Sequence, residues 1–344
     1  MISLYLGLLI FSFLITSVLV VPFINFLYKM KFYRRVQTTK DAEGNRTRIF
    51  DKFHNIKAGT PVGGGFLVIG VTLVLYLILF PLLSFMGTYI QTSYQMADEL
   101  NILFFTFISF GLLGLYDDIK KFFGFEKSGF FGLRMRHKFL IQWVLAFIIS
   151  FMMYFNLGVD IINIPFWGVL KIGPLFIPLA AFIIVSFTNA FNITDGLDGL
   201  ASGLLLISLF AFWLLSHSIL DTPLSVFIAL WIGSLLAFLY FNVYPARIFL
   251  GDVGALSFGA TLAVVGLLVG KAVALAIIGG LFIVEVVSSL IQILSKKFLK
   301  RKAFAVAPFH LWLQNQGWEE PKIVMRAWLA AIILAVLGLW LAYI

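Results

Sequence analysis

Acidic side chains border the long apolar stretches of this chain at several points. Asp117 and Asp118 directly follow one apolar stretch, and Asp252 stands in Gly-Asp-Val-Gly at the start of another. A carboxylate at a membrane boundary is costly to desolvate, so its default interpretation is functional. Cysteine is absent and the four histidines are scattered, which argues against zinc. Carboxylates that act together with phosphate favour Mg²⁺ instead.

A row of amides and carboxylates at every third position is the sharpest signal. Asn189, Asn192, Asp195 and Asp198 lie within Thr-Asn-Ala-Phe-Asn-Ile-Thr-Asp-Gly-Leu-Asp-Gly. This spacing keeps neighbours on one side of a helix, although the row rotates by about 60° at each step. The glycines that follow both aspartates indicate a helix break. A helix end beside a new helix start would direct these groups and free N–H groups to one spot, which suits phosphate and metal together.

Each of these segments also has a structural interpretation. Asp117-Asp118 could be a solvated helix end, the Asn/Asp row an Asx-rich turn, and Asp252 a helix N-cap. The glycine-rich segment 59–65 lacks the Lys-Ser/Thr ending of a P-loop, which argues against ATP hydrolysis. It fits either a loop that approaches phosphate or a tightly packed helix start.

The elements that must position these residues are membrane-spanning helices. Hydrophobic residues make up 61% of the 344 residues and charged residues 12%, a composition outside the range of soluble domains. A span needs about 20 apolar residues. The sequence therefore predicts an all-α polytopic membrane protein, residues 1–344 as a single domain, with about ten transmembrane helices at 3–27, 62–85, 101–116, 138–156, 174–191, 199–216, 223–241, 253–269, 272–294 and 323–343.

The distribution of Lys and Arg predicts the orientation, because cytoplasmic loops are enriched in these residues. Basic residues crowd the segments 29–57, 120–138 and 296–326, whereas Lys171 and Lys271 fall on the other side. Both termini are then outside, and the acidic segments form an active-site cleft that faces the cytosol. The net charge of +9 is explained mainly by anionic inner-leaflet lipids. We expect membrane lipids as partners and no nucleic acid.

One outer segment differs from the other short loops. Residues 159–174 carry β-branched side chains on both sides of Pro-Phe-Trp-Gly. A turn of this kind between two β-branched runs is typical of a hairpin. The sequence therefore predicts a small β-hairpin on the outer face.

Taken together, these segments resemble the polyprenyl-phosphate N-acetylhexosamine-1-phosphate transferases along nearly the whole chain. Several of the motifs are short, but their joint order is highly specific. The matching stretches are Lys57-Ala-Gly-Thr-Pro-Val-Gly-Gly, Asp117-Asp118, Asn189 to Asp198, Phe241-Asn-Val-Tyr-Pro, Phe249-Leu-Gly-Asp-Val-Gly, Glu285 with Gln292, Ala307-Pro-Phe-His and Gly317-Trp-Glu-Glu-Pro-Lys-Ile-Val.

The resemblance implies a role for each matching residue. Catalytic positions are Asp117, Asp118, Asp252 and His310, and the Mg²⁺ ligands are Asp252 and Asp118. Phe249 suits stacking on uracil. Substrate-binding positions are Lys57, Thr60, Lys138, Asn189, Asn192, Asp195, Gly196, Leu197, Asp198, Asn242, Phe249, Gly251, Glu285 and Gln292.

The final cytoplasmic segment is similar to the branch of the family that acts in peptidoglycan synthesis in the bacterial inner membrane. That branch transfers phospho-MurNAc-pentapeptide from UDP-MurNAc-pentapeptide to undecaprenyl phosphate, giving lipid I and UMP, and the resemblance also implies a homodimer. It typically shows three consecutive histidines, where this chain has His310-Leu311-Trp312. The departure keeps a second donor, UDP-GlcNAc, open.

Two further functions remain as alternatives to a transferase. A transporter would use intramembrane acids to carry protons or cations, but it would place them near the middle of the membrane. Here the acids of the motifs lie at one membrane edge, and Glu285 is the exception. A catalytically inactive scaffold is disfavoured because every acid of the motif set is present.

Overall fold

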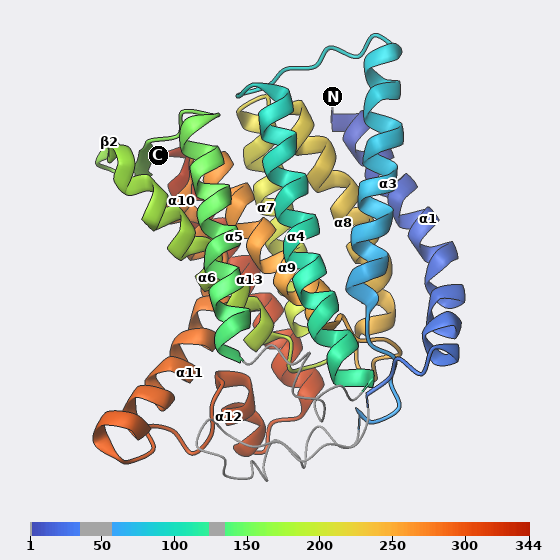
Figure 1. Ribbon diagram of the computed structural model, residues 1–344, viewed down its shortest axis with the longest axis vertical. Coiled ribbons are helices and arrows are strands. Elements are labelled where there is room, and N and C mark those ends of the chain that lie inside the picture. Colours follow the sequence, from blue (N-terminus) through green and yellow to red (C-terminus); the bar gives the residue numbers. More distant parts are fainter. Residues whose placement is uncertain (1, 35–56, 124–134) are drawn as a thin grey trace.

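The structure, a computed structural model, describes residues 2–34, 57–123 and 135–344, and it is a bundle of long helices (Figure 1). Among the described residues the only strands form one two-stranded sheet, so the predicted all-α class is confirmed. The helices are α1 (Ile2–Lys29), α3 (Gly64–Phe85), α4 (Met96–Phe123), α5 (Met135–Phe155), α6 (Phe176–Thr194), α7 (Leu200–Ser218), α8 (Thr222–Asn242), α9 (Gly251–Leu268), α10 (Ala272–Ile278), α11 (Gly280–Leu299), α12 (Phe309–Asn315) and α13 (Glu320–Tyr343).

The number of membrane spans agrees with the prediction of about ten. Within the described part of the chain, nine helices are long and apolar enough to cross a membrane, and a bent pair makes the tenth candidate. That pair, α10 and α11, corrects the prediction of one unbroken helix over 272–294, because the two helices meet at an angle of 76°. Gly279 stands at the bend, where a Cβ atom would lie 2.5 Å from the Phe187 ring, so the packing of the bend against α6 leaves no room for a side chain.

Helix α4 is longer at its charged end than the sequence predicted. The predicted span ends at residue 116, before the first aspartate, whereas α4 continues to Phe123. Lys121 pairs with Asp117 one turn earlier, at 3.2 Å, and a cation in the last turn also suits the helix dipole. The acidic pair therefore lies inside the helix and not in a loop.

Two helices form the centre of the bundle, α8 and α9. In the most apolar 18-residue stretch of each helix, 83% of the residues of α8 and 94% of those of α9 are buried. In lipid, apolar side chains alone do not drive helices together, so close backbone approach at small residues matters. A Cβ at Gly65 would lie 2.3 Å from Gly254 Cα, and a Cβ at Gly114 would lie 2.1 Å from the Asp252 carbonyl oxygen. These contacts place the start of α9 against α3 and α4.

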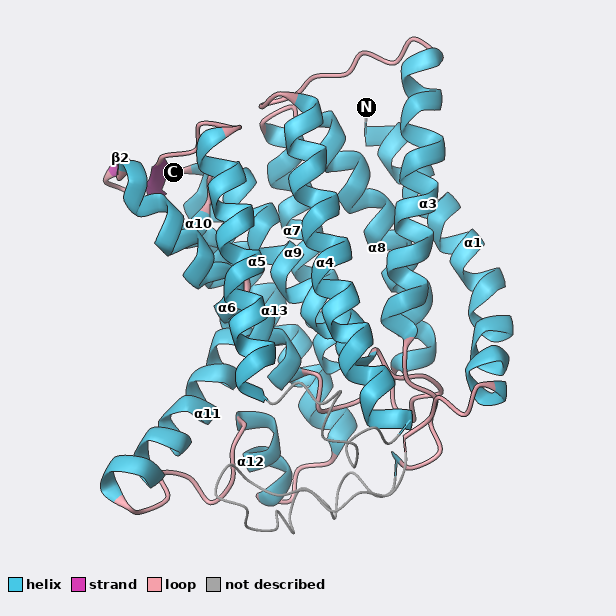
Figure 2. Ribbon diagram, in the orientation of Figure 1, coloured by secondary structure: helices cyan, strands magenta, loops and turns pink. Residues whose placement is uncertain are grey.

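The predicted hairpin is present at one end of the bundle. Strands β1 (Ile161–Ile164) and β2 (Gly168–Lys171) are antiparallel, with Asn163 opposite Val169. The hairpin and both termini lie at the same end of the bundle, whereas α12 and the C-terminal end of α4 lie at the opposite end (Figures 1 and 2). The bundle therefore has a hairpin end and an α12 end.

Candidate active site

A cavity of about 250 Å³ opens among α4, α9 and the segment between α6 and α7. We call it the α4–α9 cavity. Its lining contains cations, carboxylates, amides and one aromatic ring. The lining residues are Arg34, Lys57, Val62, Asp118, Lys121, Asn192, Asp195, Gly196, Leu197, Asp198, Asn242, Phe249, Gly251 and Asp252. Eleven residues of the predicted site are in this set.

Two lysines join the carboxylates of α4 and α9. Lys138 Nζ lies 2.8 Å from Asp117 Oδ2 and 2.5 Å from Asp252 Oδ2. Lys121 Nζ lies 3.2 Å and 2.9 Å from the same two oxygens. Each carboxylate is therefore paired with two cations. Such pairing offsets the cost of burying the charges. Asp252 is thus an ion-paired residue within the first turn of α9 and not a helix N-cap.

Asp118 is fixed by the backbone of α9. It is buried, and its Oδ2 accepts a hydrogen bond of 3.0 Å from the Val253 N–H. A carboxylate at this position accepts a hydrogen bond from an otherwise unpaired N–H group at the helix start. Its negative charge also interacts favourably with the positive end of the helix dipole. Gly251 has φ +81°, and a Cβ there would lie 2.7 Å from Asp118 Oδ2. The interpretation of Asp117-Asp118 as a solvated helix end is therefore wrong.

A second ion-pair group connects three segments that are distant in the sequence. Lys57 Nζ lies 2.6 Å from Asp198 Oδ1 and 2.5 Å from Glu320 Oε1. The same Glu320 oxygen accepts the Asp198 N–H at 2.6 Å, and Asp198 Oδ2 accepts the Ala246 N–H at 2.9 Å. Asp198 therefore has both oxygens engaged, and α13 supports the cavity wall from behind.

The helix break expected between α6 and α7 is confirmed. Helix α6 ends at Thr194, and Gly199 begins α7 in the left-handed conformation with φ +76°. Asp195 follows α6 directly and lines the cavity. Burial, reinforced by the nearby Asp252, raises the pKa of the Asp195 carboxyl to about 7, although Arg34 and Lys57 oppose the shift.

Phe249 and Asn242 line the cavity from the segment between α8 and α9. The backbone of Phe249 is held by the start of α3: its N–H donates to the Pro61 carbonyl at 2.8 Å, and its carbonyl accepts from Gly64 at 2.9 Å. Asn242 accepts a 2.6 Å hydrogen bond from Ser202 and donates to the Ile248 carbonyl. The ring of Phe249 is half-buried, so one part of it faces the cavity.

Three residues predicted to be catalytic or to bind substrate do not line the cavity: His310, Glu285 and Gln292. His310 is 1% exposed, and its Nδ1 lies 3.0 Å from Glu285 Oε2. Gly196 fits closely over the ring, because a Cβ there would lie 2.4 Å from His310 Nε2. Gln292 binds the backbone of Ala303 and Phe304. These side chains hold the segment before α12 and the loop behind the cavity.

Four other predicted residues lie outside the cavity lining. One of them is Asp117, which binds Lys121 and Lys138. Asn189 donates to Gln142 Oε1 at 2.7 Å and to the Val185 carbonyl. Thr60 pairs its backbone carbonyl with the Arg34 N–H at 3.0 Å. Lys138 reaches the cavity only through the two carboxylates that it binds. Of the four residues spaced at every third position, Asn192, Asp195 and Asp198 therefore line the cavity. Asn189 lies about one helical turn earlier in α6 and does not.

Sequence reasoning missed three charged residues, Arg34, Lys121 and Glu320. Arg34 and Lys121 line the cavity, and Glu320 binds Lys57. Both cations stand in basic segments that we attributed to lipid attraction. The signal that could have found Lys121 is its spacing of four residues from Asp117, which is the ion-pair spacing of a helix.

The residue types fit a magnesium ion that is completed by substrate. Among the described residues, no three His, Cys, Asp or Glu side chains form a ready metal cage. Mg²⁺ keeps several waters and needs only one or two protein carboxylates beside phosphate oxygens. Asp118 has one oxygen engaged by a backbone N–H and borders the cavity with Asp252. Oxygen donors at the wall of the cavity match this ion.

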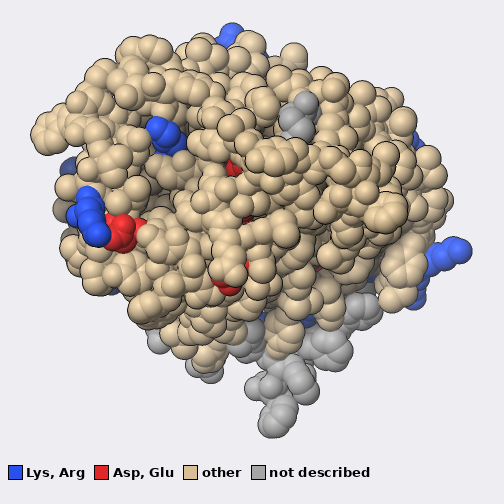
Figure 3. Space-filling view, turned by 90° about the horizontal axis from the view of Figure 1, so that it is seen from above, with Lys and Arg blue, Asp and Glu red and all other residues tan. Residues whose placement is uncertain are grey.

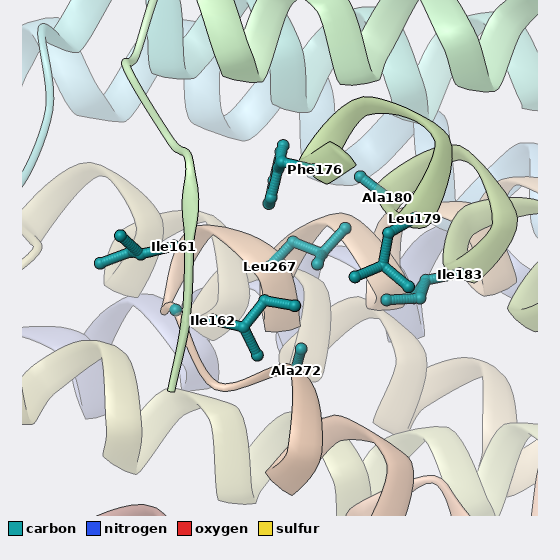
Figure 4. A pocket seen from close by; sticks show the side chains of 9 residues that line it. Ile161, Ile162, Phe176, Leu179, Ala180, Ile183, Leu267 and Ala272 are labelled. Atoms are coloured by element: carbon teal, nitrogen blue, oxygen red, sulfur yellow. The ribbon is translucent and has the colours of Figure 1, made fainter. Parts of the chain in front are cut away.

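Among the residues that the structure describes, the hairpin end has no cavity lined by charged side chains. Its small hollow, of about 10 Å³, is lined by apolar side chains of β1, α6, α9 and α10 and by Gly270 (Figure 4). Figure 3 views the molecule from that end and shows few charged side chains on a mostly uncharged face. The titratable groups that surround a cavity are therefore at the α12 end.

The structure is thus a multi-pass helical bundle with carboxylates and lysines around one cavity. The sequence model described as glycosyl transferase family 4 matches residues 100–270, which cover most of α4 and all of α5 to α9. Three relatives carry the name phospho-N-acetylmuramoyl-pentapeptide-transferase. The protein of Caldanaerobacter subterraneus subsp. tengcongensis is 35% identical over 90% of each chain. That of Clostridioides difficile is 35% identical over 94% of this chain and 93% of its own.

The third relative, from Thermodesulfovibrio yellowstonii, is 32% identical over 95% of this chain and 90% of its own. The similarity to these three relatives covers at least 90% of this chain and not the cavity alone. The chain belongs to the phospho-N-acetylmuramoyl-pentapeptide-transferase family.

Proposed function

We propose that this protein transfers phospho-MurNAc-pentapeptide from UDP-MurNAc-pentapeptide to undecaprenyl phosphate, which gives lipid I and UMP in peptidoglycan synthesis. The observation that carries the proposal is the group of Asp117, Asp252, Lys121 and Lys138, whose charges meet within 3.2 Å. Asp252 and Lys121 of this group line the α4–α9 cavity. Family membership supplies the donor and the acceptor.

The reaction is a displacement at the β-phosphorus of the donor. An oxygen of the lipid phosphate forms a bond to this phosphorus, and the bond to the oxygen that bridges both donor phosphates breaks. UMP leaves with the bonding electrons on that oxygen. Phosphoryl transfer asks the protein mainly to position reactants and to neutralise spread negative charge, and the two lysines fit that demand.

Asp252 and Asp118 would hold the Mg²⁺ ion, which when bound supplies charge neutralisation at the diphosphate. Asp118 is oriented for this by the Val253 N–H. One carboxylate of the Asp117–Asp118 pair accepts the proton of a lipid phosphate that arrives singly protonated, since the second pKa of phosphate esters is about 6. The residues therefore divide into metal ligands, cations and a base.

The remaining lining residues bind the nucleoside and diphosphate. Phe249 offers a half-buried ring for stacking on uracil. Lys57, Asn192, Asp195 and Asn242 surround it as polar partners. Glu285, Gln292 and His310 act through the loop that they support, and Asn189 acts through the α6 helix.

The α12 end faces the cytosol in this proposal. Both termini and the hairpin lie at the other end (Figure 1). The described lysines Lys57, Lys121 and Lys138 belong to the α12 end, as expected for the cytoplasmic side. The donor would enter from the cytosol, and the polyprenyl chain would lie along the exposed apolar helix faces within the inner membrane. The chain acts as a single transferase domain.

The test is UMP release by detergent-purified protein with undecaprenyl phosphate and Mg²⁺. UDP-MurNAc-pentapeptide and UDP-GlcNAc are supplied in separate reactions. Release with the first donor alone is the expected result, and it would show that one histidine suffices in this branch. Release with UDP-GlcNAc alone, or with neither donor, would contradict the proposal.

A further inference from the structure

Arg34 is fixed at the edge of the α4–α9 cavity by its backbone. Its N–H donates to the Thr60 carbonyl at 3.0 Å, and its own carbonyl accepts from the Gly59 N–H at 2.8 Å. The segment after α1 is thus paired with the segment that carries Lys57. Arg34 therefore has a defined place beside the nucleotide-binding residues.

The guanidinium of Arg34 lies over the ring of Phe249. Its central carbon is 5.7 Å from the ring centroid, within the range of a cation–π contact. The side chain is half-buried and contributes to the lining of the cavity. A contact with the ring face leaves the N–H donors at the edge of the guanidinium plane, where a ligand can reach them.

Arg34 differs from the other cations that line the cavity. Lys57 and Lys121 each bind carboxylates at 2.6 Å and 2.9 Å. Within the part of the chain that the structure describes, Arg34 has no carboxylate within ion-pair distance, and Asp195 and Asp198 act on it only through longer-range attraction. The positive charge of Arg34 is therefore available to an anion.

We infer that Arg34 binds the diphosphate of the nucleotide substrate. The inference rests on the proposed function and adds to it a residue that the motifs do not contain. A guanidinium presents five donors in a planar fork that fits two phosphate oxygens at once, and an ammonium group does not. Because the fork rests on Phe249, the stacked base and the bound phosphates would be held by neighbouring groups.

The experiment is a comparison of UDP and uridine binding, measured by calorimetry on purified protein in detergent. Uridine has the base and ribose of UDP but no phosphate, so a phosphate contact changes the affinity for UDP alone. Arg34→Ala should weaken UDP binding by roughly tenfold to a hundredfold, as expected for a lost charge-assisted hydrogen bond, and change uridine binding less than threefold. Arg34→Lys should fall between the wild type and Arg34→Ala, because it keeps the charge without the fork.

Arg247→Ala is the matched control. Arg247 is exposed and lies in the neighbouring segment between α8 and α9, so this variant removes the same charge away from the cavity and should keep both affinities. If Arg34→Ala has a lowered unfolding temperature, Arg34→Lys decides the matter through its UDP affinity alone. Unchanged UDP binding, or an equal loss for UDP and uridine, would overturn the inference.

This outcome is separable from the proposed function. If the wild type releases UMP and Arg34→Ala binds UDP as tightly as the wild type, the role of Arg34 is refuted and the proposed transferase function stands. Wild-type protein that binds UDP but transfers neither sugar phosphate would refute the proposed function and leave the UDP comparison valid.

Discussion

Helix α4 carries buried acids at both of its ends, and only one end has the features of an active site. At the α12 end, Asp117 and Asp118 meet Lys121, Lys138 and a cavity of about 250 Å³. At the hairpin end, Glu99 is fully buried and lies near Asp221. The comparison separates acids that organise helices from acids that do chemistry.

The hairpin-end pair has a structural explanation. Asp221 Oδ1 accepts the Leu224 N–H at 3.1 Å and thereby caps α8. Neither Glu99 nor Asp221 pairs with a Lys or Arg of the described segments, and no described cavity borders them. Burial of a carboxyl group is therefore not enough to define a site. The lysines and the cavity make the difference.

Removal of divalent metal should have the largest effect on turnover, and it should affect only the α12 end of the bundle. Excess EDTA should abolish UMP release, because the carboxylates and lysines alone leave the diphosphate charge incompletely neutralised. Added Mg²⁺ should restore it. The unfolding temperature without substrate should change little, since no metal is needed to cap α8. Transfer that continues in EDTA would refute the metal assignment of Asp252 and Asp118.

Truncation of Phe249 should give the next largest effect. Phe249→Ala should weaken UDP binding about tenfold to a hundredfold, since stacking of a base on an aromatic ring contributes about 1–3 kcal/mol. Turnover at saturating donor should fall less than affinity. Phe176→Ala, in the apolar hollow at the hairpin end, is the matched control and should leave UDP binding unchanged. Equal affinity in Phe249→Ala and wild type would remove Phe249 from the pocket.

The buried pair of Glu285 and His310 should act more weakly, by supporting the loop at Gly196. Glu285→Leu removes the acceptor of His310 Nδ1, and turnover should fall about threefold to tenfold, the scale of one hydrogen bond. Glu285→Gln retains an acceptor and should keep most of the activity. Nitrogen NMR of labelled histidine should report a changed tautomer in Glu285→Leu only. The same activity in both variants would contradict a positioning role.

The smallest effect should be a pH dependence of stability from Asp195. Because the pKa of Asp195 in the folded protein is raised to about 7, the folded state holds a proton that the unfolded chain releases near pH 4. The contribution to stability is present below about pH 4 and is lost as the pH rises to about 7. Asp195→Asn should therefore gain in unfolding temperature relative to wild type between pH 5 and pH 7. A constant difference over this range would contradict the raised pKa.

The sequence predicted the helices and the main carboxylates because both depend on simple regularities. Apolar length defines the spans, and the alternation of spans brings Asp117, Asp118, Asp195 and Asp252 to one face. Helix ends were less well predicted: hydropathy falls at Asp117 although α4 continues to Phe123. The break at Gly279 depends on a contact with Phe187, which no local pattern contains.

The remaining site residues could not be separated by type and spacing alone. Gln292 and Glu285 are polar residues near the site, but their partners are a backbone segment and His310. Arg34 is one of several cations in the basic segment 29–57, and tertiary pairing with Thr60 brings it to the cavity. Packing, and not charge, determines which cation of a basic segment faces the cavity.

The most direct test of the comparison is UMP release by Asp252→Asn and Glu99→Gln, prepared and measured in parallel with wild type. Both changes replace a buried carboxylate with an amide of the same size at opposite ends of the bundle. Asp252→Asn should lose turnover by a factor on the order of 100 to 1,000, the cost of losing one preorganised electrostatic group, with its unfolding temperature retained. Glu99→Gln should keep turnover near that of wild type. Normal turnover in Asp252→Asn, or an equal loss in Glu99→Gln, would contradict the assignment of the α4–α9 cavity as the transfer site.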